Sequence, residues 1–205
     1  MTQAAEQVGI PRIPVSLRWG GGAAGGSYLP QDDGLVIDAR PGTDLFISPQ
    51  RTAEALDAPR LFAHAQGDFL LSARVSVGHA RPHDAGGLLV WLNDRAWAKL
   101  GLETSAQNEP ETVSVVTRGT SDRASGFVVP GGQVWLRVAR VDSAYAFHAS
   151  LDGTYWRLIR HFALYASGAP SYGFFAQSPI GDGCSATFDQ ITFEPRRLTE
   201  LIDGS

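Results

Sequence analysis

The sequence has very little cysteine, very little lysine and no run of positive charge. Cys184 is the only cysteine among 205 residues, so no disulfide can form within the chain, and nothing in it requires an oxidising compartment. Lys99 is the only lysine, and the net charge is −4. A protein that binds a nucleic-acid backbone needs a basic stripe. These absences exclude a disulfide-rich scaffold and argue against a nucleic-acid partner.

Long hydrophobic runs are missing as well. No apolar run approaches the roughly 20 residues needed to span a bilayer, so we expect no membrane partner. The first ten residues have neither the basic region nor the apolar region of a secretory signal. Cys184 is expected to be a buried free thiol. Together these observations predict a cytoplasmic protein.

Turn-forming residues are abundant, with 23 glycines and 12 prolines spread along the chain. They separate about a dozen short strand candidates, roughly 8–12 residues apart, a spacing typical of a β-sandwich. Asp152 and Gly153 lie between two alternating runs and predict a β-hairpin, as do Asn93 and Asp94. Only residues 52–58 have modest helical character. The expected fold is all-β, a two-sheet antiparallel jelly-roll sandwich.

Alternation with period two sorts the residues of each strand onto two faces. One set is apolar, and the other mixes aromatic or small residues with residues that can form hydrogen bonds. The second set contains Trp91, Lys99, Glu103, Trp135, Arg137, His148 and Gln177. If these strands share a sheet, the set forms a polar surface with aromatic platforms, as in sugar-binding sites.

An ordinary solvent-facing sheet surface is the alternative interpretation of this set. Lys99, Glu103 and Arg137 would then be cross-strand charge pairs worth about a few tenths of a kcal/mol. The tryptophans favour a ligand groove, because a large exposed aromatic side chain is unfavourable unless it is covered or used.

Six blocks of sequence carry a resemblance to a known family: GGLLVW at 86–91, WAKLGLE at 97–103, VSVVTRGTSD at 113–122, VWLRV at 134–138, AFHASLDG at 146–153 and FAQSP at 175–179. In this order they resemble the concanavalin A-like family of unknown function typified by the "regulation of enolase" protein. They are also similar to the C-terminal β-sandwich of family 43 β-xylosidases. The resemblance covers roughly residues 15–195.

This resemblance implies a concanavalin A-like jelly roll with a concave face, and it implies no particular reaction, since this fold hosts lectins, glycosidases and lyases alike. Relatives often carry Ser-Asp-Trp where this chain has Ser121, Asp122 and Arg123, so the role of that tryptophan is lost or moved here. We expect a flexible lead-in over residues 1–14, one sandwich domain over 15–195 and a tail over 196–205.

An enzymatic role requires suitably placed acid and base groups. Glycoside hydrolases need two carboxylates, about 5 Å apart or about 6.5–9.5 Å apart. The Glu-x-Asp-x-x-Glu pattern of concanavalin A-like hydrolases is absent. Glu103 and His148, on one predicted face, are therefore the candidate catalytic pair. Lys99 and Arg137 could stabilise a carboxylate or an oxyanion.

No cofactor is expected. The histidines have no metal-ligand spacing. A structural calcium bound by Asp182 or Asp189 stays open, because calcium needs six to eight oxygen ligands.

Three functions follow from the sequence. The first is a lectin-like protein that binds a small carbohydrate or a sugar-derived ligand on its concave face, through Trp91, Lys99, Trp135, Arg137 and Gln177. The second is a small enzyme that acts on a glycoside or a sugar acid, with Glu103 and His148 as acid and base. The third is an intracellular protein-interaction module. The oligomeric state does not follow from the sequence.

Overall fold

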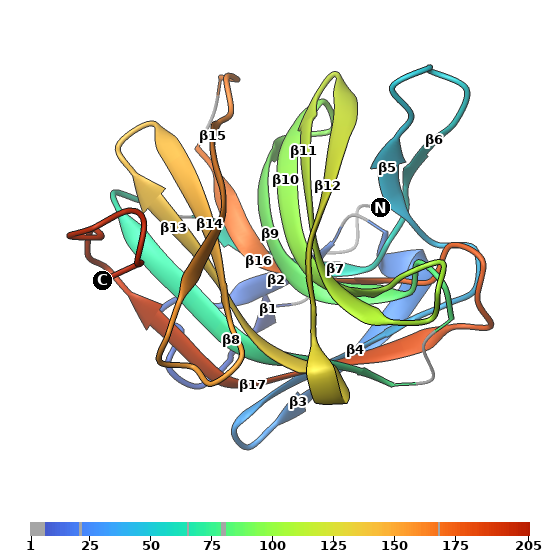
Figure 1. Ribbon diagram of the computed structural model, residues 1–205, viewed down its shortest axis with the longest axis horizontal. Helices are drawn as coiled ribbons and strands as arrows, with labels where there is room; N and C mark the ends of the chain where they lie inside the picture. Colours follow the sequence, from blue (N-terminus) through green and yellow to red (C-terminus); the bar gives the residue numbers. More distant parts are fainter. Residues whose placement is uncertain (1–6, 21, 65, 79–80, 168) are drawn as a thin grey trace.

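Two antiparallel sheets, A and B, face each other in the computed structural model (Figure 1), which describes residues 7–20, 22–64, 66–78, 81–167 and 169–205. Sheet A has the strand order β1 (Gln7–Val8), β2 (Leu17–Gly20), β7 (Arg60–His64), β16 (Ser171–Gln177), β9 (Ala85–Asn93), β10 (Ala96–Thr104), β11 (Pro110–Arg118), β12 (Thr120–Val128). Sheet B has the order β15 (Arg157–Ala163), β14 (Ala144–Ser150), β13 (Gln133–Val141), β8 (Phe69–Gly78), β17 (Cys184–Glu194), β4 (Gly34–Ala39), β3 (Gly26–Gln31). The predicted all-β sandwich is confirmed.

The apolar faces predicted by alternation meet between the two sheets. Leu88 and Val90 of β9 and Phe174 of β16 project from sheet A into one buried cluster. Leu136 of β13 and Phe147 of β14 enter the same cluster from sheet B. Because successive side chains of a strand point to opposite faces, this packing turns the polar and aromatic set of every strand outward.

The last two strands lie in the middle of the sheets. β16 pairs with β7 and β9, and β17 pairs with β8 and β4. Each of these strands therefore joins segments that are far apart in the chain. Two short 3₁₀ turns, η1 (Ala23–Gly25) and η2 (Pro130–Gly132), complete the elements.

A small hairpin covers part of the outer face of sheet A. It consists of β5 (Leu45–Ile47) and β6 (Glu54–Leu56), and it lies on the side of β9–β12 that faces away from β13–β15 (Figure 1). Leu45 and Ala58 are fully buried against Trp91, Trp97 and Phe175 of the sheet. The prediction of helical character at 52–58 is wrong, because packing on the sheet overrides the weak local preference.

Alternation did not reveal every strand. The edge strand β12 runs over Thr120–Val128. Most of its side chains are exposed, so no alternating apolar pattern marks it. The predicted hairpin at Asn93 and Asp94 joins β9 to β10, and the one at Asp152 and Gly153 joins β14 to β15.

Both ends of the described chain pack on the sandwich. Of the predicted lead-in, residues 1–6 lie outside the described residues, Val8 belongs to β1, and Ile10 and Ile13 are buried in the core. Residues 198–205, here called the C-terminal cover, lie against the outer face of sheet B, where Leu198 is buried beside Leu70. Within the described ranges, no helix has the length and apolar character to cross a membrane.

Candidate functional site

A pocket with a cavity volume of about 350 Å³ lies on the outer face of sheet A, beside the β5–β6 hairpin. This volume suits a small ligand. The hairpin, sheet A and the loops after β8 and β16 supply its walls. The lining residues are Asp44, Phe46, His83, Lys99, Glu103, Val115, Arg123, Gln177, Pro179 and Ile180. We call this cavity the Lys99 pocket.

The strand register brings the polar residues of the pocket together. Lys99 and Glu103 are four residues apart on β10, so both side chains point to the same face. Gln177 of β16 stands opposite Ala85 of β9, and Ala85 stands opposite Glu103. Gly101 lies between Lys99 and Glu103 and has no side chain. The register thus gathers Lys99, Glu103 and Gln177 on one part of the outer face, and the Phe175 ring lies beside Gly101.

The amine of Lys99 is held by two neutral acceptors. Its Nζ donates to the backbone oxygen of Leu45 at 2.7 Å and to Oε1 of Gln177. The Asp44 carboxylate is 3.8 Å away. Burial lowers the pKa of Lys99 and raises the pKa of Asp44, and the attraction between the two groups opposes both shifts. Burial therefore favours the uncharged form of each group.

The carboxylate of Glu103 is the centre of a second polar group. Its Oε1 accepts a hydrogen bond from Nη2 of Arg123 at 2.9 Å and lies 3.2 Å from Nδ1 of His83. Arg123 also donates to Glu111 at 3.2 Å. Glu103 is 5% exposed, whereas the side chain of His83 is 44% exposed. An imidazole that touches a buried carboxylate at a pocket wall can exchange protons with a ligand.

The structure separates the predicted site residues into two groups. Lys99, Glu103 and Gln177 lie together in the Lys99 pocket. Trp135, Arg137 and His148 belong to β13 and β14, which are strands of sheet B. The expectation that His148 shares a face with Glu103 is therefore wrong. Alternation shows on which side of its own sheet a side chain lies, but it does not show to which sheet the strand belongs. The outer faces of the two sheets point away from each other, so Glu103 and His148 lie on opposite sides of the sandwich.

Trp91 lies on the outer face of sheet A but outside the pocket lining. It is 8% exposed, and its ring stacks on Trp97 with a centroid distance of 5.8 Å. The guanidinium of Arg60 lies 4.3 Å from the ring and donates hydrogen bonds to the carbonyls of Leu56 and Ala58. The hairpin thus covers this tryptophan, and burial lowers the pKa of Arg60 to about 10.

The C-terminal cover occupies part of the outer face of sheet B, over β13 and β14. His148 is fully buried, and its Nε2 lies 2.7 Å from the carbonyl oxygen of Leu201. Arg137 donates to the carbonyl of Gly204 at 2.6 Å, and its guanidinium lies 3.7 Å from the ring of Trp156. Burial lowers the pKa of Arg137 to about 10. The backbone carbonyls of Leu201 and Gly204 therefore occupy the positions beside His148 and Arg137 where the predicted ligand would bind.

Trp135 lies on the same outer face of sheet B. Its Nε1 donates to Gln190 at 3.1 Å, and Gly153 packs closely on its ring. The tryptophan therefore contacts the loop between β14 and β15.

Sequence reasoning did not place His83, Asp44 or Arg123 in the site. His83 and Asp44 lie outside regular strands, so alternation could not orient them. His83 has a positive φ of 70°, a turn conformation that brings its ring over Glu103. Arg123 had a signal, because the family resemblance implies a tryptophan at this position, and Arg123 lines the pocket.

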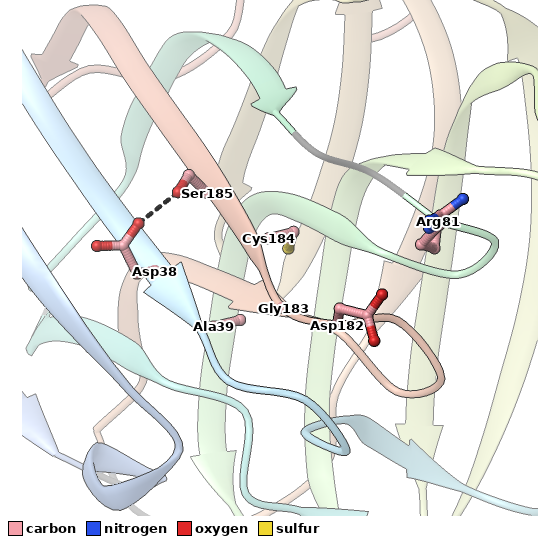
Figure 2. A pocket seen from close by; sticks show the side chains of 7 residues that line it. All are labelled: Asp38, Ala39, Arg81, Asp182, Gly183, Cys184 and Ser185. Carbon is pink, nitrogen blue, oxygen red and sulfur yellow. Dashed lines mark hydrogen bonds between the residues drawn. The ribbon is translucent and has the colours of Figure 1, made fainter.

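A second hollow lies where β4 ends and β17 begins, with a cavity volume of about 660 Å³ (Figure 2). Asp38 and Ser185 are hydrogen-bonded to each other there. The thiol of Cys184 donates to the carbonyl of Gln177 at 3.1 Å, and burial raises its pKa to about 12. Such a thiol is a poor nucleophile at neutral pH. None of the described residues that line this hollow is aromatic.

A metal site finds no support in the side chains that the structure describes. Among them, no group of three or more His, Cys, Asp or Glu residues is arranged to hold a metal ion. Asp189, one of the two residues considered for calcium, accepts two hydrogen bonds of 2.7 Å from Arg74. The calcium hypothesis stays a prediction.

Comparisons with known proteins agree with the resemblance found in the sequence. The chain is 30% identical over 125 residues to "Regulation of enolase protein 1" of Saccharomyces cerevisiae, which is 60% of this chain and 62% of that relative's length. A functionally unknown protein from Saccharomyces cerevisiae has a similar structure, with a TM-score of 0.74, 22% identity and coverage of 83% of this chain and 96% of that one. A xylan β-1,4-xylosidase from Bacillus halodurans matches with a TM-score of 0.62 and 12% identity, over 78% of this chain and 32% of that one. A family model described as "Protein of unknown function (DUF1349)" matches residues 26–196, so the chain belongs to this family.

Proposed function

We propose that the protein is a lectin-like carbohydrate-binding module and that the Lys99 pocket is its binding site. One observation carries the proposal. Asp44 and Glu103 each have a carboxylate oxygen, Oδ2 and Oε2, with no hydrogen-bond partner among the described residues, and both line one small cavity. Sugar hydroxyls are good donors to such oxygens, since a carboxyl oxygen accepts a hydrogen bond whether or not the group is ionised, and the bond is short and strong where it is.

The remaining walls fit a polyol. Phe46, Val115 and Ile180 offer apolar surface to the C–H face of a sugar ring, while Gln177 and Lys99 fix the polar edge. The likeness to the xylan β-1,4-xylosidase concerns the fold alone, so the proposal rests on the pocket.

The charges of the pocket favour a neutral ligand. Arg123 is already paired with Glu103 and Glu111, and Lys99 is already bonded to Leu45 and Gln177. A phosphate or a sugar acid would have to compete with Glu103 and Glu111 for Arg123, and with the Leu45 and Gln177 oxygens for Lys99. A neutral mono- or disaccharide meets no such competition.

The test is a thermal-shift screen with methyl glycosides and oligosaccharides, followed by titration calorimetry. A ligand at 100 times its Kd stabilises the fold by about 2.7 kcal/mol. Glu103→Gln removes the charged acceptor and is expected to weaken binding about ten- to hundredfold, since charge-assisted hydrogen bonds are worth about 1.5–3 kcal/mol. His148→Gln, on the other sheet, is the matched control and should bind like the wild type. Equal binding by the Glu103→Gln protein would remove the pocket from the proposal.

An enzyme acting on a glycoside or sugar acid is the second candidate function. The contact of 3.2 Å between His83 and Glu103 favours it, because this pair could serve as general acid and base. NMR of protein–sugar mixtures over a day distinguishes the two functions. Consumption of a sugar that stops in His83→Gln supports the enzyme, and an unchanged ligand supports the module. We also propose a cytoplasmic location, which the single buried free thiol supports.

A further inference from the structure

We propose that Lys99 is a nucleophilic amine that condenses with the aldehyde carbon of an open-chain sugar to form a reversible imine. This inference rests on the proposed carbohydrate site and names the ligands that react there: reducing sugars and short hydroxy-aldehydes. It assigns the amine a chemical role beyond hydrogen bonding.

The hydrogen bonds of Lys99 match those of a neutral amine. A neutral amine has two N–H donors and one lone pair, and Nζ has two acceptors, the Leu45 carbonyl at 2.7 Å and the Gln177 amide oxygen. Among the described residues no third acceptor lies within hydrogen-bond distance, since the nearest Asp44 oxygen is 3.8 Å away. The fourth tetrahedral direction of the nitrogen is left for the lone pair.

The surroundings of Nζ favour attack on a carbonyl. The side chain of Lys99 is 5% exposed, and its Nζ lies 5.4 Å from the centre of the Phe175 ring. Lys99 also lines the cavity, so a small ligand can reach it. Burial lowers the pKa of this amine, which increases the unprotonated fraction at neutral pH. A desolvated lysine in an apolar environment is a typical amine nucleophile.

The reaction needs no further reagent. The lone pair of Nζ bonds to the aldehyde carbon, and a proton moves from nitrogen to oxygen to give a carbinolamine. Loss of the hydroxyl group as water, with one proton delivered to it and the last nitrogen proton released, gives the imine. Burial raises the pKa of Asp44, so its carboxyl group is suited to deliver that proton over the short distance from Lys99.

The chain itself provides a sharp readout. Lys99 is the only lysine, so the amino terminus is the only other primary amine. At pH 7 about a tenth of a terminal amine with an ordinary pKa is unprotonated, against about 1 in 2,500 for an ordinary lysine. An ordinary Lys99 would therefore react far more slowly than the terminus. A reactive Lys99 would match or exceed it.

The experiment treats the full chain with glyceraldehyde and sodium cyanoborohydride at pH 7 and then digests it with trypsin. Reduction of the imine blocks cleavage after Lys99 and yields the uncut peptide of residues 96–118 with added mass. We expect this peptide to form at least as fast as the modified peptide of residues 1–12. In guanidinium chloride the order should reverse, since the unfolded chain has an ordinary lysine. Lys99→Arg should give no label within 96–118.

The outcomes separate this inference from the function on which it rests. Labelling of the terminus alone in the folded protein overturns the imine. If methyl glycosides, which have no free aldehyde, still stabilise the fold in that case, the carbohydrate site stands without it. If no glycoside stabilises the fold, the carbohydrate site is overturned.

Discussion

On the outer face of sheet A, Lys99 and Glu103 line a cavity, whereas on the outer face of sheet B, Arg137 and His148 lie beneath the C-terminal cover. In the sequence both pairs belong to strands that mix aromatic and polar residues in the same alternation. The difference between them comes from the segment of chain that packs on each face. The β5–β6 hairpin covers only part of sheet A and leaves a cavity beside it. On sheet B, the backbone carbonyls of the C-terminal cover contact the polar side chains of Arg137 and His148.

The two faces also satisfy their basic side chains differently. Lys99 has an amide oxygen and a carbonyl as acceptors, with Asp44 close by. Arg137 has one carbonyl and an aromatic ring, and its Nε has no partner among the described residues. An incompletely paired guanidinium is unfavourable when buried. On sheet A, a ligand in the cavity can replace one of the hydrogen bonds of Lys99. On sheet B, Arg137 holds the backbone of the C-terminal cover in place.

The largest expected effect distinguishes the tryptophans of the two faces. Trp97 is fully buried under the hairpin, so Trp97→Ala should lower the free energy of unfolding by about 3–5 kcal/mol. Trp135 is only partly buried, and Trp135→Ala should have a clearly smaller effect. Urea denaturation measures both. Equal losses would mean that the hairpin does not make a second core on sheet A.

The next effect concerns the C-terminal cover. Leu198→Ala removes a buried side chain from a small cluster, and we expect a loss of about 2 kcal/mol, near the low end for such truncations. Ile202→Ala, at a residue that is 64% exposed, is the control and should change stability by less than about 0.5 kcal/mol. Neither variant should alter ligand binding in the Lys99 pocket. A binding defect in Leu198→Ala would show that the two faces are coupled.

The smallest effect is a dependence of stability on pH. Burial lowers the pKa of His148, and Arg137 lowers it further, while the Leu201 carbonyl and Asp203 act in the opposite direction. The unfolded chain therefore binds this proton more readily, so the contribution of His148 is fully present above about pH 6.5 and declines as the pH falls. The slope cannot exceed about 1.4 kcal/mol per pH unit for one proton.

Urea titrations between pH 5 and pH 7.5 measure this slope. His148→Gln has no titrating ring at this position, so its stability should fall less steeply below pH 6.5 than that of the wild type. Parallel pH profiles for the two proteins would contradict the assignment of the shift to His148.

Much of the fold could be predicted from the sequence, and less of the site. The alternating pattern places Leu88 and Val90 on the apolar face of their strand and Lys99 and Glu103 on the polar face of theirs, as in the structure. It does so because a period of two separates the two faces of a strand. It could not assign β13 and β14 to a different sheet, since sheet membership depends on pairing between distant segments. His83 escaped prediction because its position depends on a turn with positive φ.

The central positions of β16 and β17 have a consequence for synthesis of the protein. Both sheets remain divided until the final strands arrive, because β16 separates β7 from β9 and β17 separates β8 from β4. A nascent chain that has just emerged through β15 therefore has unpaired strand edges in both sheets. Such edges are prone to aggregation, and closure through contacts distant in sequence is slow. Neither sheet can be completed on the ribosome until nearly the whole chain has emerged.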